Sequence, residues 1–410
     1  MNETLPADMT LALDGGKAVR ASALPPWPHF AADEIDAVQA VLTSGDVNYW
    51  TGQECTSFET EFAQYVGSRY AVALANGSVA LELALHALGI GPGDEVIVPS
   101  RSFMATASCV VLRGARPVFA DVDAASGNLC ADTVRAALTS RTKAVIPVHL
   151  AGWPCDMDPL LELAREHDLK VIEDCAQSHG AAYKGRITGS LGHVGAFSFC
   201  QDKIITTGGE GGMLVTDDPA LWERAWSYKD HGKSYETVFN REHPPGFRWL
   251  HESFGTNWRM TEMQAAIGRR QLLKLPAWIG ARRSNAELLD AQLAHVRGLD
   301  LCVPRADCVH AYYKYCAFVD PARLRAQWTR ERIVEALNAE GIPCISGSCS
   351  EIYLEQAFAE TGLRPAARLP VARRLGETSV MFMVHPTLER QDILDTAAAI
   401  RKVMHAAALP

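Results

Sequence analysis

The sequence predicts an α/β protein, with a mostly parallel seven-stranded sheet in a large domain and a smaller α/β domain after it. From about Tyr70 to Asp218, short β-branched runs alternate with helical runs, the pattern of a parallel sheet covered by helices on both faces. After Asp218 helical patterns dominate until a strand-like run begins near residue 313. A chain of 410 residues is long enough for two domains. We expect the large domain over residues 1–290 and the small one over 291–410.

Each expected strand is a short apolar run bounded by polar or turn residues. The seven runs are Ala71–Leu74, Glu95–Pro99, Pro117–Asp121, Ala144–Val148, Val171–Asp174, Ala196–Phe199 and Met213–Thr216. The segments between them place apolar residues three and four apart, as amphipathic helices do. The expected helices are Val79–Leu88, Thr106–Leu112, Ala131–Ala137 and Pro159–His167.

The second half of the chain is predicted from the same periodicities. An aromatic and charged loop, Lys233–Phe254, leads into a long helical pattern over Met260–Leu288. We expect this loop either to line a substrate entrance or to contact a second subunit. The small domain is expected to hold helices near Arg330–Glu340 and Gln391–Ala406. Its strand-like run Tyr313–Val319 begins in a cluster of tyrosines and one lysine, which we expect to pack inside that domain.

Composition excludes several classes of protein. The 39 Lys+Arg against 48 Asp+Glu leave a net charge of −9, so the basic surface that nucleic-acid binding requires is not expected. No apolar run reaches the about 18 residues of a membrane span, and the N-terminus lacks signal-peptide features, so we expect a cytoplasmic protein. The 11 cysteines form no C-x-x-C pair and are odd in number, which favours reduced thiols over disulfides or a metal site.

Two charged residues near the carboxyl ends of expected strands carry the strongest chemical signal. Asp174 ends a buried apolar strand, at the edge where open parallel sheets bind ligands. Lys203 follows the next strand, beside the glycine-rich loop Thr206–Gly212. A lysine can hold the aldehyde of pyridoxal phosphate as a Schiff base, and an aspartate can keep its pyridine nitrogen protonated. Taken singly, the aspartate also suits a helix N-cap and the lysine a solvated surface position.

Two other strand ends suit cofactor binding. In Leu74-Ala-Asn76-Gly77-Ser78 a strand is followed by a small-residue turn and an amphipathic helix. This places free N–H groups and a hydroxyl at a helix N-terminus, where a phosphate binds readily. Phe103 emerges from a polar turn and suits stacking on a cofactor ring. Each segment also has an ordinary interpretation: the first as an N-capped turn between a strand and a helix, and Phe103 as a core residue.

These blocks occur in one order along the chain, and together they resemble the DegT/DnrJ/EryC1/StrS aminotransferases. The resemblance covers nearly the whole chain. It rests most on Asp174, Gln177, Ser198 and Lys203, together with the run Asn257–Gly268. Members of this family are pyridoxal-phosphate enzymes of the aspartate-aminotransferase-like fold, fold type I, and act on keto-sugars and related ketones. The resemblance therefore implies this fold and this cofactor.

The resemblance also implies a role for each matching residue. Lys203 would hold the cofactor and then act as the base that moves a proton between donor and cofactor, and Asp174 would pair with the pyridinium nitrogen. The other implied contacts are Phe103 stacked on the ring, Gln177 at the ring hydroxyl, and Gly77, Ser78, Ser198 and Asn257 at the phosphate. Asn257 would reach the phosphate from the neighbouring subunit, which implies a homodimer with shared active sites.

The implied reaction transfers an amino group from L-glutamate or L-glutamine to a keto-sugar, with a nucleotide-linked sugar as the leading prediction, in cell-surface polysaccharide or secondary-metabolite synthesis. The start of the chain, Leu13–Arg20 and Pro25–Pro28, resembles members that act on free cyclitol ketones of the scyllo-inosose type or make aminohydroxybenzoate, so these substrates stay open. Members that catalyse deoxygenation carry histidine in place of Lys203, which disfavours a sugar dehydratase. The presence of both Lys203 and Asp174 disfavours a non-catalytic homologue.

Overall fold

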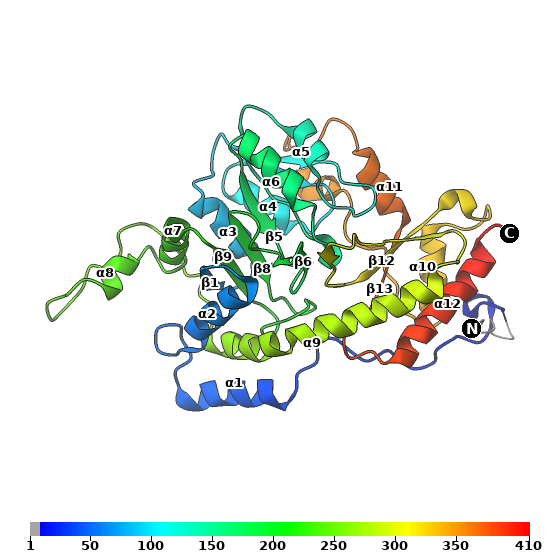
Figure 1. Cartoon of the computed structure of the whole chain (residues 1–410), viewed down its shortest axis with the longest axis horizontal. Helices are drawn as coiled ribbons and strands as arrows, with labels where there is room; N and C mark the ends of the chain where they lie inside the picture. Colours follow the sequence, from blue (N-terminus) through cyan, green and yellow to red (C-terminus); the bar gives the residue numbers. More distant parts are fainter. Residues whose placement is uncertain (1–8) are drawn as a thin grey trace.

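A seven-stranded sheet forms the centre of the molecule in the computed structural model, which describes residues 9–410 (Figure 1). The strand order is β1 (Tyr70–Leu74), β9 (Gly212–Thr216), β8 (Val194–Ser198), β5 (Lys170–Asp174), β4 (Thr142–Val145), β2 (Glu95–Pro99) and β3 (Arg116–Ala120). Neighbouring strands are parallel except for β9, which is antiparallel to both β1 and β8. All seven predicted strands are confirmed, although β4 ends before the predicted Val148.

Each face of this sheet has its own apolar core, because successive residues of a strand point to opposite faces. Val72 and Leu74 of β1 pack with α3, α4 and α7, whereas Ala71 and Ala73 pack with α2 and α9 (Glu262–Leu293). Helices α5 and α6 cover the β4 and β5 half of the second face. The first-half helices are α2 (Glu54–Val66), α3 (Gly77–Ala87), α4 (Ala105–Leu112), α5 (Ala131–Ala137), α6 (Met157–Glu166) and α7 (Pro219–Lys229). The four helices predicted between the strands are confirmed.

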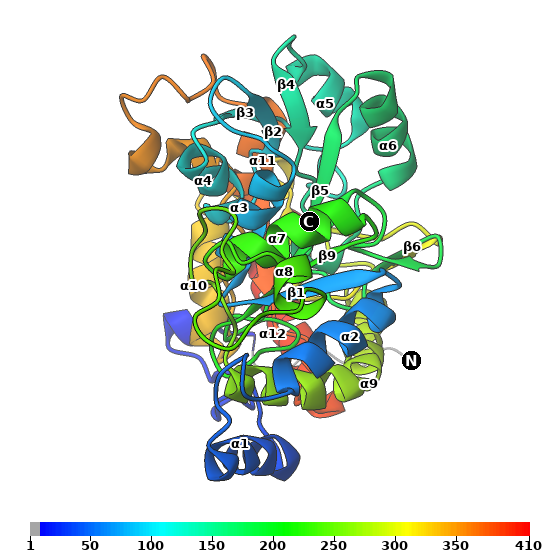
Figure 2. The same ribbon diagram turned by 90° about the vertical axis from the view of Figure 1, so that its left-hand side faces the viewer.

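The long helix α9 (Glu262–Leu293) runs from beneath the sheet to the C-terminal part of the chain (Figure 1). It begins at Thr261, whose hydroxyl caps the helix by accepting from the Gln264 N–H. Helix α1 (Ala32–Ser44) lies along its outer side (Figure 2). The predicted helix over 260–288 is confirmed and continues five residues further.

The C-terminal part has a three-stranded antiparallel sheet of its own. It consists of β10 (Leu299–Leu301), β12 (Tyr315–Val319) and β13 (Ser379–Phe382), packed with α10 (Arg330–Ala339), α11 (Pro370–Thr378) and α12 (Arg390–Ala407). Leu11 joins the same core, so the N-terminal segment packs here although it lies far away in sequence. The predicted α/β character is confirmed, and the boundary at residue 290 stays a prediction.

Two smaller features complete the fold. Strands β6 (Ala182–Tyr183), β7 (Arg186–Ile187) and β11 (Cys308–Val309) form a short third sheet. The segment 233–254, here called the arm, carries α8 (Tyr235–Phe239) and projects from the body at the end of the molecule opposite α12 (Figure 1). Within residues 9–410, no helix combines the length and the apolar character that a membrane span requires.

Candidate active site

The carboxyl ends of β2, β5 and β8 open into one pocket with a volume of about 860 Å³. Seven of the eight residues predicted for the site line this pocket: Gly77, Ser78, Phe103, Asp174, Gln177, Ser198 and Lys203. Two segments of the C-terminal part, Tyr313–Lys314 and Gly347–Cys349, also line it. The pocket therefore lies between the large sheet and the C-terminal part.

One end of the pocket is the N-terminus of α3. The side chain of Asn76 caps this helix by accepting from the Val79 N–H, which leaves the first N–H groups, those of Gly77 and Ser78, without an acceptor inside the helix. A side chain at position 77 is impossible, because a Cβ there would lie 2.5 Å from the Cβ of Ser198. This close approach brings the hydroxyl of Ser198 to the helix N-terminus, and the two together suit a phosphate group.

Lys203 approaches the pocket from the loop after β8. Its backbone is held from behind, because the indole N–H of Trp27 donates to the Lys203 carbonyl over 2.9 Å. Its ammonium lies 4.9 Å from the centroid of the Tyr313 ring, and no carboxylate of residues 9–410 pairs with it within 4.0 Å. The amine thus faces the cavity without a salt bridge that would hold it in place.

Asp174 is a fully buried carboxylate at the end of β5. Its oxygens accept from the Ala176 N–H at 3.1 Å and from the Thr106 hydroxyl at 2.9 Å. Burial raises the pKa of Asp174 despite these two hydrogen bonds and the more distant positive charge of Lys203. Since no cation of the described chain pairs with it directly, a cationic ligand atom would stabilise its charged form.

Gln177 and Phe103 occupy two further positions on the pocket wall. The Oε1 of Gln177 accepts from the Ala151 N–H at 2.7 Å, which leaves the amide NH₂ as its donor toward the cavity. Ala151 has a positive φ of 56°, so this hydrogen bond supports a strained backbone position. Phe103 is 69% exposed and offers a ring face at the pocket. Both positions fit their predicted contacts with a ring, which stay predictions.

The residues Asp202, Tyr313 and Lys314 join the pocket although the sequence did not indicate them. The prediction that the tyrosine cluster only packs inside the small domain is wrong for Tyr313 and Lys314. The Tyr313 hydroxyl donates to Asp202 over 2.5 Å. Burial opposes ionisation of Asp202, but this hydrogen bond, Lys203 and Lys314 outweigh it and lower the Asp202 pKa. The one sequence feature that could have indicated any of these three residues is that Asp202 immediately precedes Lys203.

Asn257 is the predicted site residue that does not line the pocket of its own chain. It is exposed and follows the arm, where its backbone bridges Asp230. Asp230 accepts from the Trp50 indole at 2.7 Å, from Lys233 at 3.0 Å and from Arg259 at 2.5 Å. These bonds fix the backbone on which Asn257 lies, and its contact with a neighbouring subunit's phosphate stays a prediction.

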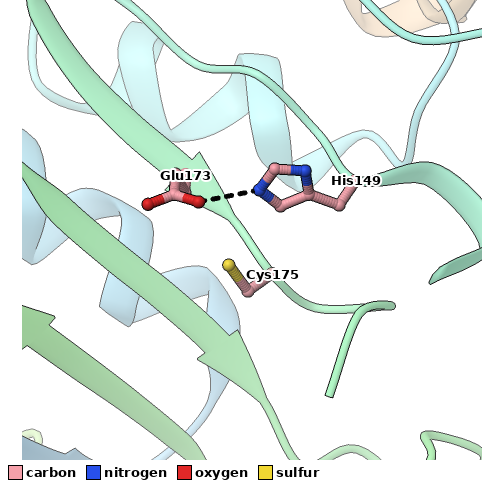
Figure 3. Close-up of side chains that lie close together, drawn as sticks. All are labelled: His149, Glu173 and Cys175. Carbon is pink, nitrogen blue, oxygen red and sulfur yellow. Dashed lines mark hydrogen bonds and ion pairs between the residues drawn. The ribbon is translucent and has the colours of Figure 1, made fainter. Parts of the chain in front are cut away.

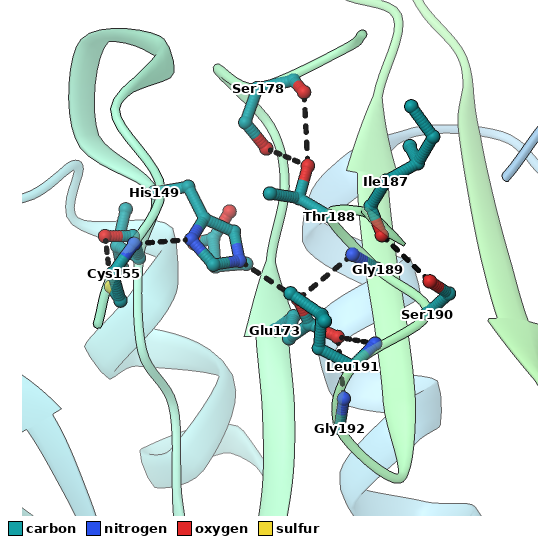
Figure 4. Close-up of polar contacts among 12 residues, drawn as sticks. His149, Cys155, Glu173, Ser178, Ile187, Thr188, Gly189, Ser190, Leu191 and Gly192 are labelled. Atoms are coloured by element: carbon teal, nitrogen blue, oxygen red, sulfur yellow. Dashed lines mark hydrogen bonds and ion pairs between the residues drawn. The ribbon is translucent and has the colours of Figure 1, made fainter. Parts of the chain in front are cut away.

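A second polar cluster lies on the other side of β5. His149, Glu173 and Cys175 are all buried and close enough together to resemble a metal site (Figure 3). However, the Glu173 carboxylate already has four donors (Figure 4). These are His149 Nε2 at 2.9 Å and the N–H groups of Gly189 at 2.8 Å, Leu191 at 2.7 Å and Gly192 at 2.7 Å. Because the His149 Nδ1 also accepts from the Cys155 N–H at 3.0 Å, we assign the cluster a structural role beside Asp174.

Replacing Glu173 with glutamine should destabilise the protein by about 3 kcal/mol, because an amide cannot accept four hydrogen bonds. Burial acts to raise the Glu173 pKa, but the bonds from His149 and the loop hold it below its usual value. Because the Glu173 pKa is lower in the folded than in the unfolded protein, the carboxylate stabilises the fold above the unfolded pKa, and this stabilisation is lost on acidification. The stability difference between the wild type and the variant should therefore shrink below about pH 5. Urea midpoints at pH 7 and pH 4.5 measure the loss of stability and its pH dependence. Glu166→Gln, at an exposed glutamate, is the control. An unchanged midpoint at pH 7 would contradict the structural role.

Comparison with known proteins identifies the family. Residues 28–401 match the model of the DegT/DnrJ/EryC1/StrS aminotransferase family. The chain belongs to this family. The family, the fold and the transaminase class predicted from the sequence are thereby confirmed.

Three proteins illustrate how closely this chain resembles known aminotransferases. The UDP-N-acetyl-3-dehydro-alpha-D-glucosamine 3-aminotransferase of Acidithiobacillus ferrooxidans is 38% identical over 92% of this chain and 96% of its own. A solved aminotransferase of Psychrobacter cryohalolentis is 57% identical, with a TM-score of 0.90 over 92% of this chain and 98% of its own. A putative sugar aminotransferase from Streptococcus pneumoniae, solved in its PMP form, has a TM-score of 0.83 at 25% identity, over 93% and 98% of the two chains.

Proposed function

We propose that this DegT-family protein uses pyridoxal phosphate to transfer an amino group from glutamate or glutamine to a keto-sugar. The observation that carries the proposal is that one pocket brings together the Lys203 amine, the buried Asp174 carboxylate and the open helix N-terminus at Gly77. These three groups match the aldehyde, the pyridine nitrogen and the phosphate of the cofactor.

The residues present fit this cofactor. Asp174 lacks a directly paired cation among residues 9–410, and a protonated pyridine nitrogen would supply one. The glycine at position 77 keeps the backbone open where a Cβ would collide with Ser198. When bound, the cofactor supplies an electron sink that stabilises negative charge on the donor carbon.

Each pocket residue then has a defined task. The Nζ of Lys203 would hold the cofactor covalently at rest and, once released, would take the proton from the α-carbon of the donor and deliver it to the cofactor carbon. Asp174 would keep the pyridine nitrogen protonated, and its hydrogen bonds from Thr106 and Ala176 keep the carboxylate in place. Gln177 would donate its amide N–H to the ring oxygen, because its own oxygen is already engaged by the Ala151 N–H.

The acceptor is proposed to be a nucleotide-linked keto-sugar, in cell-surface polysaccharide or secondary-metabolite synthesis in the cytoplasm. The proposal is supported by the similarity to the Acidithiobacillus ferrooxidans enzyme, whose name specifies a UDP-linked keto-sugar. A free cyclitol ketone or an aminohydroxybenzoate precursor is the alternative that the start of the sequence keeps open.

The test uses the colour of the cofactor. The purified protein should absorb in the near ultraviolet and visible range, and borohydride should fix the cofactor to Lys203. Glutamate or glutamine should bleach the band, and a panel of nucleotide-linked keto-sugars and free cyclitol ketones should show which ketone restores it. A protein that pyridoxal phosphate cannot reconstitute would refute the proposal. Failure with every common donor would instead favour the dehydratase.

We further propose a homodimer in which Asn257 reaches the phosphate site of the neighbouring subunit. Asn257 is exposed and does not line the pocket of its own chain, which supports this arrangement, as do the exposed aromatic residues of the arm that precedes it. Phe247, Trp249 and Phe254 are 79%, 82% and 99% exposed, which is unusual for aromatic residues that have no partner protein.

Mixing two inactive variants tests the shared site. We expect Lys203→Ala and Asn257→Ala each to be impaired alone. After unfolding and joint refolding, half of the dimers should be mixed, and one site in each mixed dimer has both residues intact. About a quarter of the wild-type activity per site should therefore return. If Asn257 served its own chain, no mixed dimer would contain an intact site and no activity would return.

A further inference from the structure

Lys314 is the one cationic side chain besides Lys203 among the described residues that line the pocket. We propose that its ammonium binds the α-carboxylate of the amino donor. This inference rests on the proposed aminotransferase function. The donor carries its α-carboxylate on the same carbon from which Lys203 removes the proton, so a cation near Lys203 is the group that suits it.

Lys314 lies at the required end of the pocket. The Tyr313 ring is the common neighbour of the two amines, because its centroid is 4.9 Å from the Nζ of Lys203 and 4.8 Å from the Nζ of Lys314. The backbone position is fixed, since Lys314 immediately precedes β12. Both amines therefore border the same ring, and besides burial the positive charge of Lys203 is among the causes that lower the Lys314 pKa. A donor whose α-carbon lies at Lys203 can direct its carboxylate toward Lys314.

The ammonium of Lys314 has few partners within the chain. Its nearest acceptor is the Sδ of Met383 at 3.4 Å, and thioether sulfur accepts only weakly. Its carboxylate neighbour, Asp202, is 3.7 Å away, beyond hydrogen-bond distance, and also accepts from Tyr313. The Lys314 side chain is only 12% exposed, so water compensates little for its three N–H donors. Burial lowers the pKa of Lys314, as expected for a cation that gains a full partner only when a ligand binds.

The other buried cations nearby are less suited to this task. Arg101 lies behind the wall and donates to the Ser350 hydroxyl at 2.8 Å. Arg282 donates to the carbonyl oxygens of Tyr312 and Tyr313 at 3.2 and 3.3 Å. Neither guanidinium group lines the pocket, so a bound donor would not reach them without a change in the wall.

The test measures the two half-reactions separately in Lys314→Gln and Lys314→Arg. With glutamate, Lys314→Gln should raise the donor concentration for half-maximal bleaching by about 10- to 100-fold, the range for losing a hydrogen bond to a charged group. Lys314→Arg, which keeps the charge, should recover part of this loss. The rate of the second half-reaction, in which the amino form of the cofactor reacts with the keto-sugar, should change less than threefold. The unchanged absorbance band and thermal midpoint of each variant check that it folds and holds the cofactor.

Modified donors identify which carboxylate is bound. Isoglutamine, in which an amide replaces the α-carboxylate, should be a poorer donor than glutamate for the wild type but not for Lys314→Gln. Glutamine lacks only the side-chain carboxylate, so Lys314→Gln should weaken the donor dependence for glutamine as much as for glutamate. Calorimetric binding of glutarate, which cannot react, should weaken in the same variant.

Three results would overturn the proposal. The first is an unchanged donor dependence in Lys314→Gln, and the second is discrimination against isoglutamine that survives the substitution. The third is a loss confined to the keto-sugar half-reaction, which would assign the ammonium to an anionic group of the sugar. If no donor bleaches even the wild type, the proposed function fails, while glutarate binding still reports whether Lys314 holds a carboxylate.

Discussion

Replacing Lys203 with alanine should reduce transamination by about 10⁴-fold, the upper range for losing a proton-transferring group. Lys203 and Lys314 are the two amines that line the pocket in the described chain. The proposed function assigns the aldehyde and the donor proton to Lys203. Single-turnover bleaching with glutamate measures the loss. The variant should also fail to retain the cofactor after borohydride treatment and denaturation, because the covalent anchor is gone.

Lys184→Ala is the matched control for this experiment. Lys184 is an exposed lysine that pairs with Asp158 far from the pocket, so its loss should leave the absorbance band and the turnover unchanged. Substantial activity in Lys203→Ala would contradict both the aminotransferase and the dehydratase hypotheses, because each assigns the chemistry to the Lys203 amine.

Replacing Asp174 with asparagine should lower kcat by about 10²- to 10³-fold, the range for removing a preorganised electrostatic partner. An amide cannot hold the pyridine nitrogen in its protonated form, so the electron sink weakens. The same change should make the cofactor-free protein more stable at pH 7. Burial raises the Asp174 pKa, and a raised folded pKa means that the charged carboxylate costs stability once the pH exceeds the unfolded value.

The two readouts for Asp174→Asn are the half-reaction rate and the urea midpoint of the cofactor-free protein. The stability gain should shrink as the pH falls toward the unfolded pKa of about 3.9, because below it the carboxyl group is protonated in both the folded and the unfolded protein. Asp158→Asn, at an exposed aspartate that pairs with Lys184, should leave the half-reaction rate unchanged and should not stabilise the protein. A variant that keeps wild-type rates would show that Asp174 does not pair with the ring nitrogen.

Neighbouring residues on β5 separate function from stability. Asp174 faces the pocket and Glu173 faces the opposite side, where four donors satisfy it. The sequence places both carboxylates at the end of a buried strand, and strand alternation predicts that they point apart. Which of them lacks a partner depends on the loop at Gly189–Gly192, and no local pattern in the sequence indicates that loop.

The seven strands, the helices between them and the order of the motifs were predictable because they depend on local periodicity. A β-branched run or an amphipathic repeat specifies its element within a few residues. Seven of the eight predicted site residues line one pocket for the same reason, since they follow strand ends that a parallel sheet brings to one edge.

What the sequence by itself determined is therefore the α/β fold class, the mostly parallel sheet and the sheet edge at which Asp174 and Lys203 line one pocket. Only the tertiary structure decided that Lys314 enters the same pocket. Lys314 is more than a hundred residues from Lys203 in sequence and reaches the pocket by packing of the C-terminal sheet. This contact depends on how the core of the C-terminal part packs against the core of the large sheet. The periodicity of apolar residues specifies local helices and strands, and it carries no information about contacts between residues so far apart in sequence.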